Sequence, residues 1–298
     1  MPAARADAEI APMTAGDENF PVGSWLLPRA LRPHVAVFYN FARGADDIAD
    51  SPDLPAAEKY ARLDGFEAAL HGDAADDPAT APALRMRESL AETGIAPRHC
   101  YDLLDAFRQD VATRRYADWE ALMAYCARSA NPVGRYLLDL HGETTELYTV
   151  SDPLCSALQV INHLQDAQDD LRRLDRVYVP QDWFAAAGID ARALDADRSS
   201  PALRGVLDRC LDGVDALLAQ TAPLPTALRH RRLALESAAI LSVAQDLAAA
   251  LRVRDPLAGR VVQSRAAFVA HAARGILGTL IRRTVSRGPS SHAATPHP

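Results

Sequence analysis

Residues 35–50, VAVFYNFARGADDIAD, form an apolar run that ends in two aspartates four residues apart. Such a run indicates a helix that is buried on most sides. Residues four apart on a helix share one face, so Asp46 and Asp50 would point the same way. A single pair of this kind is more often part of a solvated helix face, and the pair becomes informative only if a second one accompanies it.

A second stretch repeats the pattern more than a hundred residues later. Residues 158–170 read LQVINHLQDAQDD. Asn162, Asp166 and Asp170 follow one another at four-residue steps after an apolar segment, so they would form one stripe of a helix. Each stretch also carries a polar companion in register, Arg43 in the first and Asn162 in the second. The recurrence favours a functional site over a solvated surface.

Aspartates in this arrangement predict a magnesium site for a diphosphate. Magnesium prefers octahedral oxygen ligation and is usually held by one or two carboxylates together with substrate phosphates. If Asp46, Asp50, Asp166 and Asp170 converge, they suit a diphosphate that arrives as a magnesium complex. Bound metal also neutralises a leaving diphosphate, which promotes ionisation of an allylic carbon–oxygen bond. The apolar helices around the site would hold the hydrocarbon.

The rest of the chain predicts an all-α fold, because apolar residues recur at i, i+3 and i+4 and β-branched alternation is scarce. The expected helices cover residues 28–50, 55–71, 80–93, 97–113, 118–127, 132–148, 152–174, 203–220, 226–253 and 264–284. They lie within residues 17–286, and length alone does not decide whether they form one domain or two. A flexible leader at 1–16 and a disordered tail at 287–298 would flank them.

Composition narrows the classes of partner. A net charge of −7 and an isoelectric point near 5.7 argue against nucleic-acid binding, which needs a basic surface. The four cysteines are scattered, which disfavours a zinc site or a disulfide framework. No signal sequence is recognisable, and no apolar stretch reaches the roughly 18 residues of a membrane span. The expected location is the cytoplasm.

The two acidic motifs resemble those of the squalene and phytoene synthase family. The matching segments are residues 31–50, the pair Tyr125 and Cys126, residues 162–170 and residues 176–180, and the resemblance extends from about Glu18 to about Arg265. It implies the isoprenoid synthase fold, a single helical domain around a central cavity. It also implies that the aspartate pairs lie on opposite cavity walls and bind magnesium diphosphate.

The resemblance implies roles for further residues by their position. Arg43 would contact the diphosphate, and Asn162 would belong to the second metal site. Tyr178 would lie near the diphosphate end of the pocket. Arg260, within residues 258–261, matches a family arginine that contacts substrate.

Some segments are more similar to the bacterial hydroxysqualene synthase branch of the family, which converts presqualene diphosphate to hydroxysqualene in hopanoid biosynthesis. They are residues 18–24, ENFPVGS, and residues 129–135, SANPVGR. Many family members carry an arginine where this chain has Gln165. Members that join two farnesyl diphosphates carry a tyrosine where this chain has Ala127. The absence of that tyrosine fits an enzyme that starts from the cyclopropyl intermediate.

The reaction implied is that of a carbon–oxygen lyase. Magnesium held by the four aspartates would draw diphosphate from presqualene diphosphate, the cation would rearrange, and water would capture it without any hydride donor. Asn131 is a candidate for positioning the water. The stronger alternative is that Asn131 caps the helix predicted to begin at Pro132.

Other functions stay open. Presqualene diphosphate synthase, squalene synthase and phytoene synthase are sister activities on the same fold, and a prenyltransferase of this kind would use farnesyl diphosphate. A non-catalytic helical scaffold is the alternative from another class, although a scaffold has no need for four convergent carboxylates.

The last predicted helix, 264–284, offers a further partner. It places Phe268, Ala272, Ile276, Leu280 and Ile281 toward one side and ends in arginines. Such a helix suits core packing, which is the stronger interpretation, or peripheral contact with the inner face of the cytoplasmic membrane. Other hopanoid-pathway enzymes are candidate partners.

Overall fold

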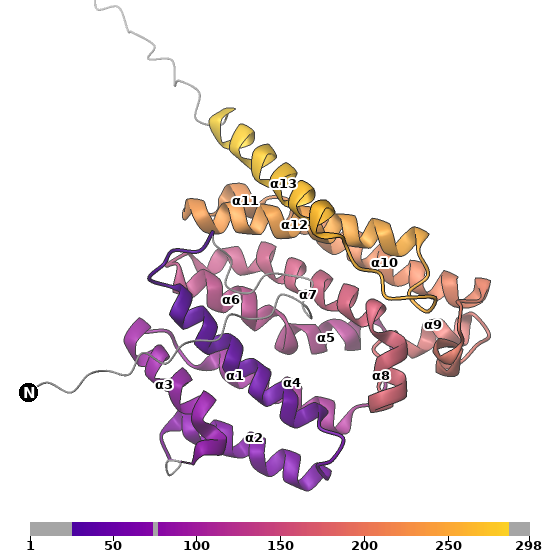
Figure 1. The fold of residues 1–298 in the computed structure, drawn as a ribbon, viewed down its shortest axis with the longest axis horizontal. Coiled ribbons are helices and arrows are strands. Elements are labelled where there is room, and N and C mark those ends of the chain that lie inside the picture. The colour runs from indigo at the N-terminus through magenta and orange to yellow at the C-terminus, as the bar shows by residue number, and fades with distance from the viewer. Residues whose placement is uncertain (1–25, 74–76, 286–298) are drawn as a thin grey trace, which may run out of the picture.

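The computed structural model describes residues 26–73 and 77–285, and every regular element in them is a helix (Figure 1). In chain order the elements are α1 (Arg32–Asp50), α2 (Ala56–His71), η1 (Pro78–Thr80), α3 (Ala81–Thr93), α4 (Arg98–Ala112), α5 (Trp119–Ser129), α6 (Asn131–Leu140), η2 (Thr145–Leu147), α7 (Tyr148–Gln165), α8 (Ala167–Leu174), α9 (Gln181–Ala186), η3 (Ala191–Asp195), α10 (Pro201–Thr221), α11 (Leu224–Ala227), α12 (Arg231–Val253) and α13 (Arg265–Val285). The all-α prediction is confirmed. The predicted leader, the predicted tail and residues 18–24 lie outside the described residues.

Two predicted helices are interrupted. The helix predicted at 132–148 ends at Leu140, and Gly142 follows with a left-handed φ of 66°, which glycine adopts without steric cost. The helix predicted at 152–174 begins earlier, at Tyr148, and consists of α7 and α8, which meet at Asp166. The sequence pattern also does not predict α9 and α11, which are six and four residues long.

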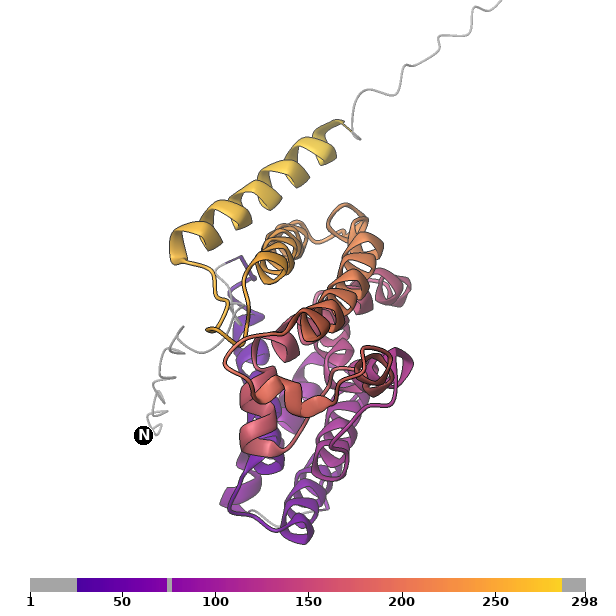
Figure 2. The ribbon, with the colours of Figure 1, turned by 90° about the vertical axis from the view of Figure 1, so that its right-hand side faces the viewer.

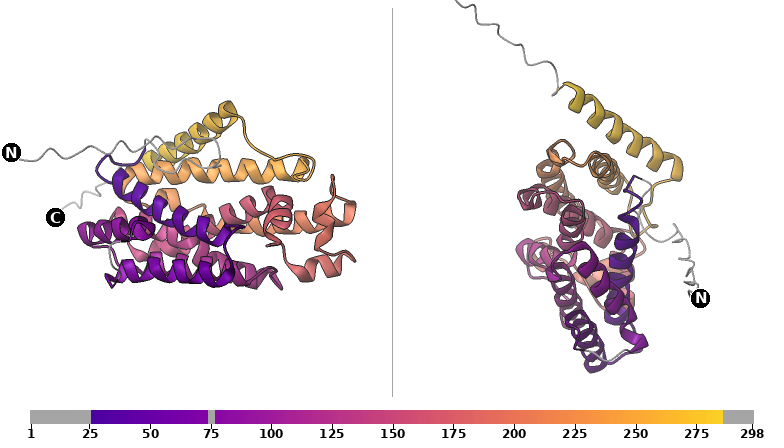
Figure 3. Two further views of the ribbon diagram at one scale, coloured as in Figure 1. Left: turned by 60° about the horizontal axis from the view of Figure 1, so that its bottom comes forward. Right: turned by 90° about the vertical axis from the view of Figure 1, so that its left-hand side faces the viewer.

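The helices are stacked in layers on both sides of α7 (Figure 1). Helices α1 to α4 pack on one another at one end, and α4 also contacts α5 and α6. Helix α7 packs against α5 and α6 on one side and against α10 and α12 on the other. Helix α13 lies outside the stack along α12 (Figures 2 and 3).

A continuous apolar core joins these layers. Tyr136 of α6 and Phe41 of α1 are among its largest fully buried side chains. Phe38 stacks on Tyr136 with ring centroids 4.0 Å apart, which ties α1 to α6. The core contacts of Phe38 and Phe41 therefore fix the rotation of α1, and with it the direction of the polar residues that follow.

Helix α12 is the one helix in the described part of the chain that is long and apolar enough to cross a membrane by length and composition. About two thirds of its apolar window, 67%, is buried inside the fold. A helix that is buried to this extent is typical of a protein core.

Candidate active site

A cavity of about 540 Å³ lies among α1, α4 to α8, α11 and α12. One set of lining residues is polar or charged: Tyr39, Arg43, Asp46, Asp50, Asp110, Tyr125, Ser129, Ser151, Gln159, Asn162, His163, Asp166, Asp170, Arg176, Tyr178, Glu236, Ser237 and Arg260. Another set is apolar: Leu27, Val35, Phe38, Ala42, Phe107, Val133, Leu137, Leu138, Leu154, Leu158, Leu224, Leu233 and Ile240. The volume is in the range of cavities that hold small molecules.

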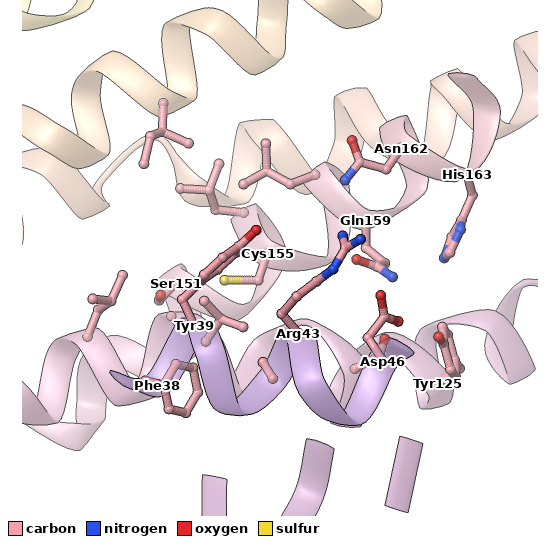
Figure 4. Close-up of a pocket in the computed structure, with 18 of the residues that line it drawn as sticks. Phe38, Tyr39, Arg43, Asp46, Tyr125, Ser151, Cys155, Gln159, Asn162 and His163 are labelled. Atoms are coloured by element: carbon pink, nitrogen blue, oxygen red, sulfur yellow. The ribbon is translucent and has the colours of Figure 1, made fainter. Parts of the chain in front are cut away.

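Helix α1 supplies one wall of the polar end. Arg43, Asp46 and Asp50 follow one another at steps of three and four residues, so they share the face that lines the cavity. In Figure 4, Arg43 and Asp46 point from α1 toward Gln159 and Asn162 of α7. Both predicted acidic motifs therefore line one cavity from facing helices.

The second acidic motif lies across a helix junction. Asp166 ends α7 and precedes α8, with φ −106° and ψ 6°. Its amide donates to the carbonyl of Asn162 at 3.0 Å, and the amide of Asp170 donates to the carbonyl of Asp166 at 2.8 Å. Because the four-residue hydrogen bonds continue across the junction, the three side chains keep a common face despite the break. All three line the cavity.

An extended segment after α8 carries Arg176 and Tyr178 into the polar end. Asp175 adopts a left-handed φ of 50°, which turns the chain, and the amide of Val177 then donates to the carbonyl of Arg114 at 2.9 Å. Arg176 is only 3% exposed, and its Nη1 lies 2.9 Å from Oδ1 of Asp50. This segment thus connects α1 to the loop that follows α4.

Asp110 of α4 is a functional candidate that the sequence reasoning missed. It is 3% exposed and lines the cavity. Tyr125 donates to its Oδ2 at 2.7 Å and Tyr178 donates to its Oδ1 at 3.1 Å. Nη1 of Arg176 lies 3.8 Å from Oδ1 of Asp110. The buried carboxylate of Asp110 therefore orients Tyr178, which the resemblance places near the diphosphate end of the pocket.

Arg260 reaches the cavity from the segment after α12. Its Nε lies 3.1 Å from Oδ1 of Asp166, so the arginine meets the second acidic motif. The neighbouring carbonyl, that of Val261, accepts a hydrogen bond from the buried side chain of Gln165. Gln165 therefore anchors the segment that presents Arg260.

The carboxylates at the polar end are costly to ionise in the metal-free protein. Burial, together with the charges of Asp50 and Asp110, raises the pKa of Asp46 to about 7. Burial, followed by the charge of Asp166, raises the pKa of Asp170 to about 7. Burial also raises the pKa of Asp166, although Arg260 opposes the shift.

This electrostatic arrangement fits magnesium ions shared with a substrate. No group of three or more His, Cys, Asp or Glu side chains within residues 26–73 and 77–285 is arranged to hold a metal ion by itself. Burial of Asp46 and Asp170 is the main cause of their raised pKa values, so their charged carboxylates lack solvation in the metal-free protein. Such a donor set suits magnesium that is bound jointly by protein carboxylates and substrate phosphates.

Asn131 and Ala127, which the sequence analysis related to the choice of reaction, do not line the cavity. Asn131 is 6% exposed, is not among the lining residues, and accepts a hydrogen bond from Ser156 at 2.9 Å. It is also the first residue of α6 and makes no capping bond, so the predicted cap is wrong. Neither role proposed for Asn131 has support in this geometry. Ala127 is likewise absent from the lining residues.

His163 lines the cavity as a packed, neutral ring. It stacks on Tyr178 with ring centroids 3.5 Å apart. Burial and the charge of Arg176 lower the pKa of His163 to about 3. The imidazole is therefore uncharged near neutral pH.

The arrangement of the helices corresponds to the isoprenoid synthase fold. The squalene synthase HpnC from Alicyclobacillus acidocaldarius matches with a TM-score of 0.68 and 32% identity, over 78% of this chain and 87% of that one. A dehydrosqualene synthase matches in fold with a TM-score of 0.74 at 18% identity, over 86% and 89% of the two chains.

Sequence comparisons identify the family. The squalene/phytoene synthase family model matches residues 13–267. The hydroxysqualene synthase of Rhodopseudomonas palustris is 43% identical over 94% of this chain and 95% of its own length. That of Zymomonas mobilis is 40% identical over 87% and 88%. The chain belongs to the squalene/phytoene synthase family.

Proposed function

We propose that this chain is a hydroxysqualene synthase, which ionises presqualene diphosphate with the aid of magnesium and gives hydroxysqualene and diphosphate. The observation that carries the proposal is that both aspartate pairs line one cavity whose remaining wall is largely apolar. The 43% identity to the hydroxysqualene synthase of Rhodopseudomonas palustris, over nearly the whole of both chains, supports the choice of substrate and product.

The polar end would bind the diphosphate. Asp46, Asp50, Asp166 and Asp170, with Asn162 beside the second pair, would hold magnesium. Magnesium, when bound, neutralises charge on the leaving diphosphate and so promotes heterolysis of the carbon–oxygen bond.

Two arginines would add positive charge to the diphosphate site. Arg260 pairs with Asp166 at 3.1 Å, which fixes its guanidinium at the wall. Arg43 lies on the cavity face of α1, and its Nε is 3.0 Å from Oδ1 of the exposed Asp47. Both would contact the diphosphate oxygens directly.

The apolar wall of the cavity would determine how the carbocation reacts. The bond to diphosphate breaks with its electron pair on the leaving oxygen, the cyclopropylcarbinyl cation rearranges, and one water adds with loss of a proton. Apolar side chains such as Leu154, Leu158 and Leu233 exclude bulk water, which protects the cation until it has rearranged. The aromatic ring of Phe38, which also lines the cavity, stabilises positive charge. This chemistry is that of a carbon–oxygen lyase.

The test is product analysis with purified protein and magnesium, in the absence of NADPH. One reaction receives presqualene diphosphate and a parallel one receives farnesyl diphosphate, and the extracts are identified by mass spectrometry. We expect hydroxysqualene from the first and no turnover in the second. Conversion of farnesyl diphosphate to presqualene diphosphate would reassign the chain to a prenyltransferase. No turnover of either substrate would favour a non-catalytic scaffold.

A further inference from the structure

Helix α13 presents an apolar face to the outside of the molecule. The exposed side chains on this face recur at three- and four-residue steps: Ala266, Val269, Ala270, Ala273, Leu277 and Ile281, which we call the α13 stripe. Val269, Leu277 and Ile281 are 64%, 60% and 55% exposed. Leucine and isoleucine side chains this open, aligned on one helix face, mark an interaction surface.

The opposite face of α13 fixes the helix against α12. A Cβ on Gly275 would lie 2.2 Å from the carbonyl oxygen of Ala238, so the two backbones are in close contact there. Nε2 of His271 lies 3.0 Å from Oδ1 of Asp246. Because the inner face already has these partners, the exposed α13 stripe lies on the side of the helix away from α12.

This orientation corrects the sequence interpretation, which placed Phe268, Ala272 and Ile281 on one side of the helix. Phe268 and Ala272 pack against the core, whereas Ile281 is exposed. Core packing and an outward apolar face are therefore both present, on opposite sides of α13.

Arginines accompany the α13 stripe. Helix α13 carries Arg265, Arg274, Arg282 and Arg283 and contains no Asp or Glu, although the whole chain has a net charge of −7. Arg265 and Arg282 are exposed, and so is Arg274, which also donates to Oγ of Ser242 on α12 at 3.2 Å. Arg283 donates to the carbonyl of Leu228. The stripe is thus an apolar surface on a helix without acidic residues in an acidic protein, and its occupant must accept both apolar side chains and positive charge.

We propose that α13 docks the protein on an anionic lipid bilayer, with the α13 stripe at the level of the acyl chains and the arginines among the headgroups. An interfacial helix of this kind gains from apolar burial and from attraction to anionic lipid. A second copy of the chain fits less well, because a two-fold contact would bring one basic helix against the other. The inference concerns binding alone and holds whether or not the proposed reaction is correct.

The test is sedimentation of the full chain with sucrose-loaded vesicles of neutral phosphatidylcholine, with or without phosphatidylglycerol. We expect binding to the anionic vesicles that is weakened by added salt, because exposed charges are screened. The double variant Leu277→Glu/Ile281→Glu should lose binding by about tenfold or more, since it puts two negative charges at the lipid surface. Val253→Glu is the matched control, because Val253 is 84% exposed at the end of α12 and lies off the stripe. It should bind like the wild type.

Circular dichroism melting and turnover of detergent-dispersed substrate would show that the variants fold. Equal binding to neutral and anionic vesicles, or unchanged binding of the double variant, would overturn the proposal. So would an oligomer in sedimentation velocity that the double variant converts to a monomer, because a second copy would then occupy the stripe.

Discussion

At the residue scale, the buried aspartates of the site lower the stability of the metal-free protein. Asp46 and Asp170 are buried carboxyls near other acids, which is why their pKa values rise to about 7. A site that must receive magnesium and diphosphate keeps its carboxylates close together, and this closeness destabilises the fold until the ions arrive.

The variant Asp46→Asn should therefore separate activity from stability. Loss of a carboxylate that supports ionisation should lower kcat by about a hundredfold, the scale seen when one electrostatic stabiliser of a transition state is removed. The metal-free variant should nevertheless unfold at a higher temperature than the wild type at pH 8, because a neutral amide replaces a buried carboxylate that is costly to ionise. Asp53→Asn is the control just after the same helix, since Asp53 is exposed and does not line the cavity. A lower melting temperature for Asp46→Asn would contradict this account.

The raised pKa values also predict how stability depends on pH. The folded pKa of about 7 for Asp46 and Asp170 lies above the value of about 3.9 in an unfolded chain, so the folded state holds protons that the unfolded state has released. The free energy of unfolding of the metal-free protein should fall as the pH rises from 5 to 8. Urea titrations in EDTA measure it. The double variant Asp46→Asn/Asp170→Asn should show a weaker fall, and equal slopes for both proteins would rule out this origin.

Individual site residues were predictable where the sequence carried a repeated pattern or matched a motif of the family. Asp46, Asp50, Asp166 and Asp170 follow apolar runs at helical spacing, and the structure brings all four to one cavity. Asp110 offers no such signal, because a lone acid in a helix resembles a solvated one. Its burial depends on Tyr125 and Tyr178, which come from distant segments. The cap predicted at Asn131 was wrong, because the sequence does not show that α6 begins at this residue and that its side chain accepts a hydrogen bond from Ser156.

At the scale of the elements, long helices followed from periodicity, whereas their interruptions did not. Helix α6 ends at Leu140, and the chain then turns toward Glu143, whose carboxylate is buried. This carboxylate accepts hydrogen bonds from the backbone amides of Arg229 at 3.2 Å and His230 at 2.6 Å. That partner lies more than eighty residues away, so a local pattern cannot reveal it. Helices α9 and α11 are too short to show a period.

The contact between α12 and α13 gives a prediction at this scale. Gly275→Ala should loosen α13, because the new Cβ would overlap the carbonyl of Ala238, and overpacking of this kind costs about 1–3 kcal/mol. Gly278→Ala on the same helix meets nothing closer than 3.9 Å and should stabilise α13 by up to ~1 kcal/mol through helix propensity. Amide hydrogen exchange in α13 reports both effects. Equal exchange in the two variants would show that the close approach at Gly275 does not hold the helix.

At the scale of the whole molecule, different helices supply the acidic and the apolar parts of the cavity. Helices α1, α7 and α8 carry the acidic motifs, α6, α11 and α12 add apolar wall, and α13 lies outside the cavity along α12. The family and the fold were predictable, since the ordered motifs span most of the chain and the family model matches residues 13–267. The fate of the cation depends on the shape of the apolar wall, which no single motif encodes.

The most direct test of the central claim follows the origin of the product oxygen. Presqualene diphosphate is incubated with the protein and magnesium in oxygen-18-labelled water, and the extracted alcohol is analysed by mass spectrometry. If the carbon–oxygen bond ionises at the aspartate pairs and water captures the rearranged cation, the hydroxysqualene formed carries the label. An unlabelled alcohol with the carbon skeleton of presqualene would mean that water attacks phosphorus and the diphosphate is only hydrolysed. A labelled alcohol with that skeleton would mean that water captures the cation before it rearranges. Either result would contradict the account.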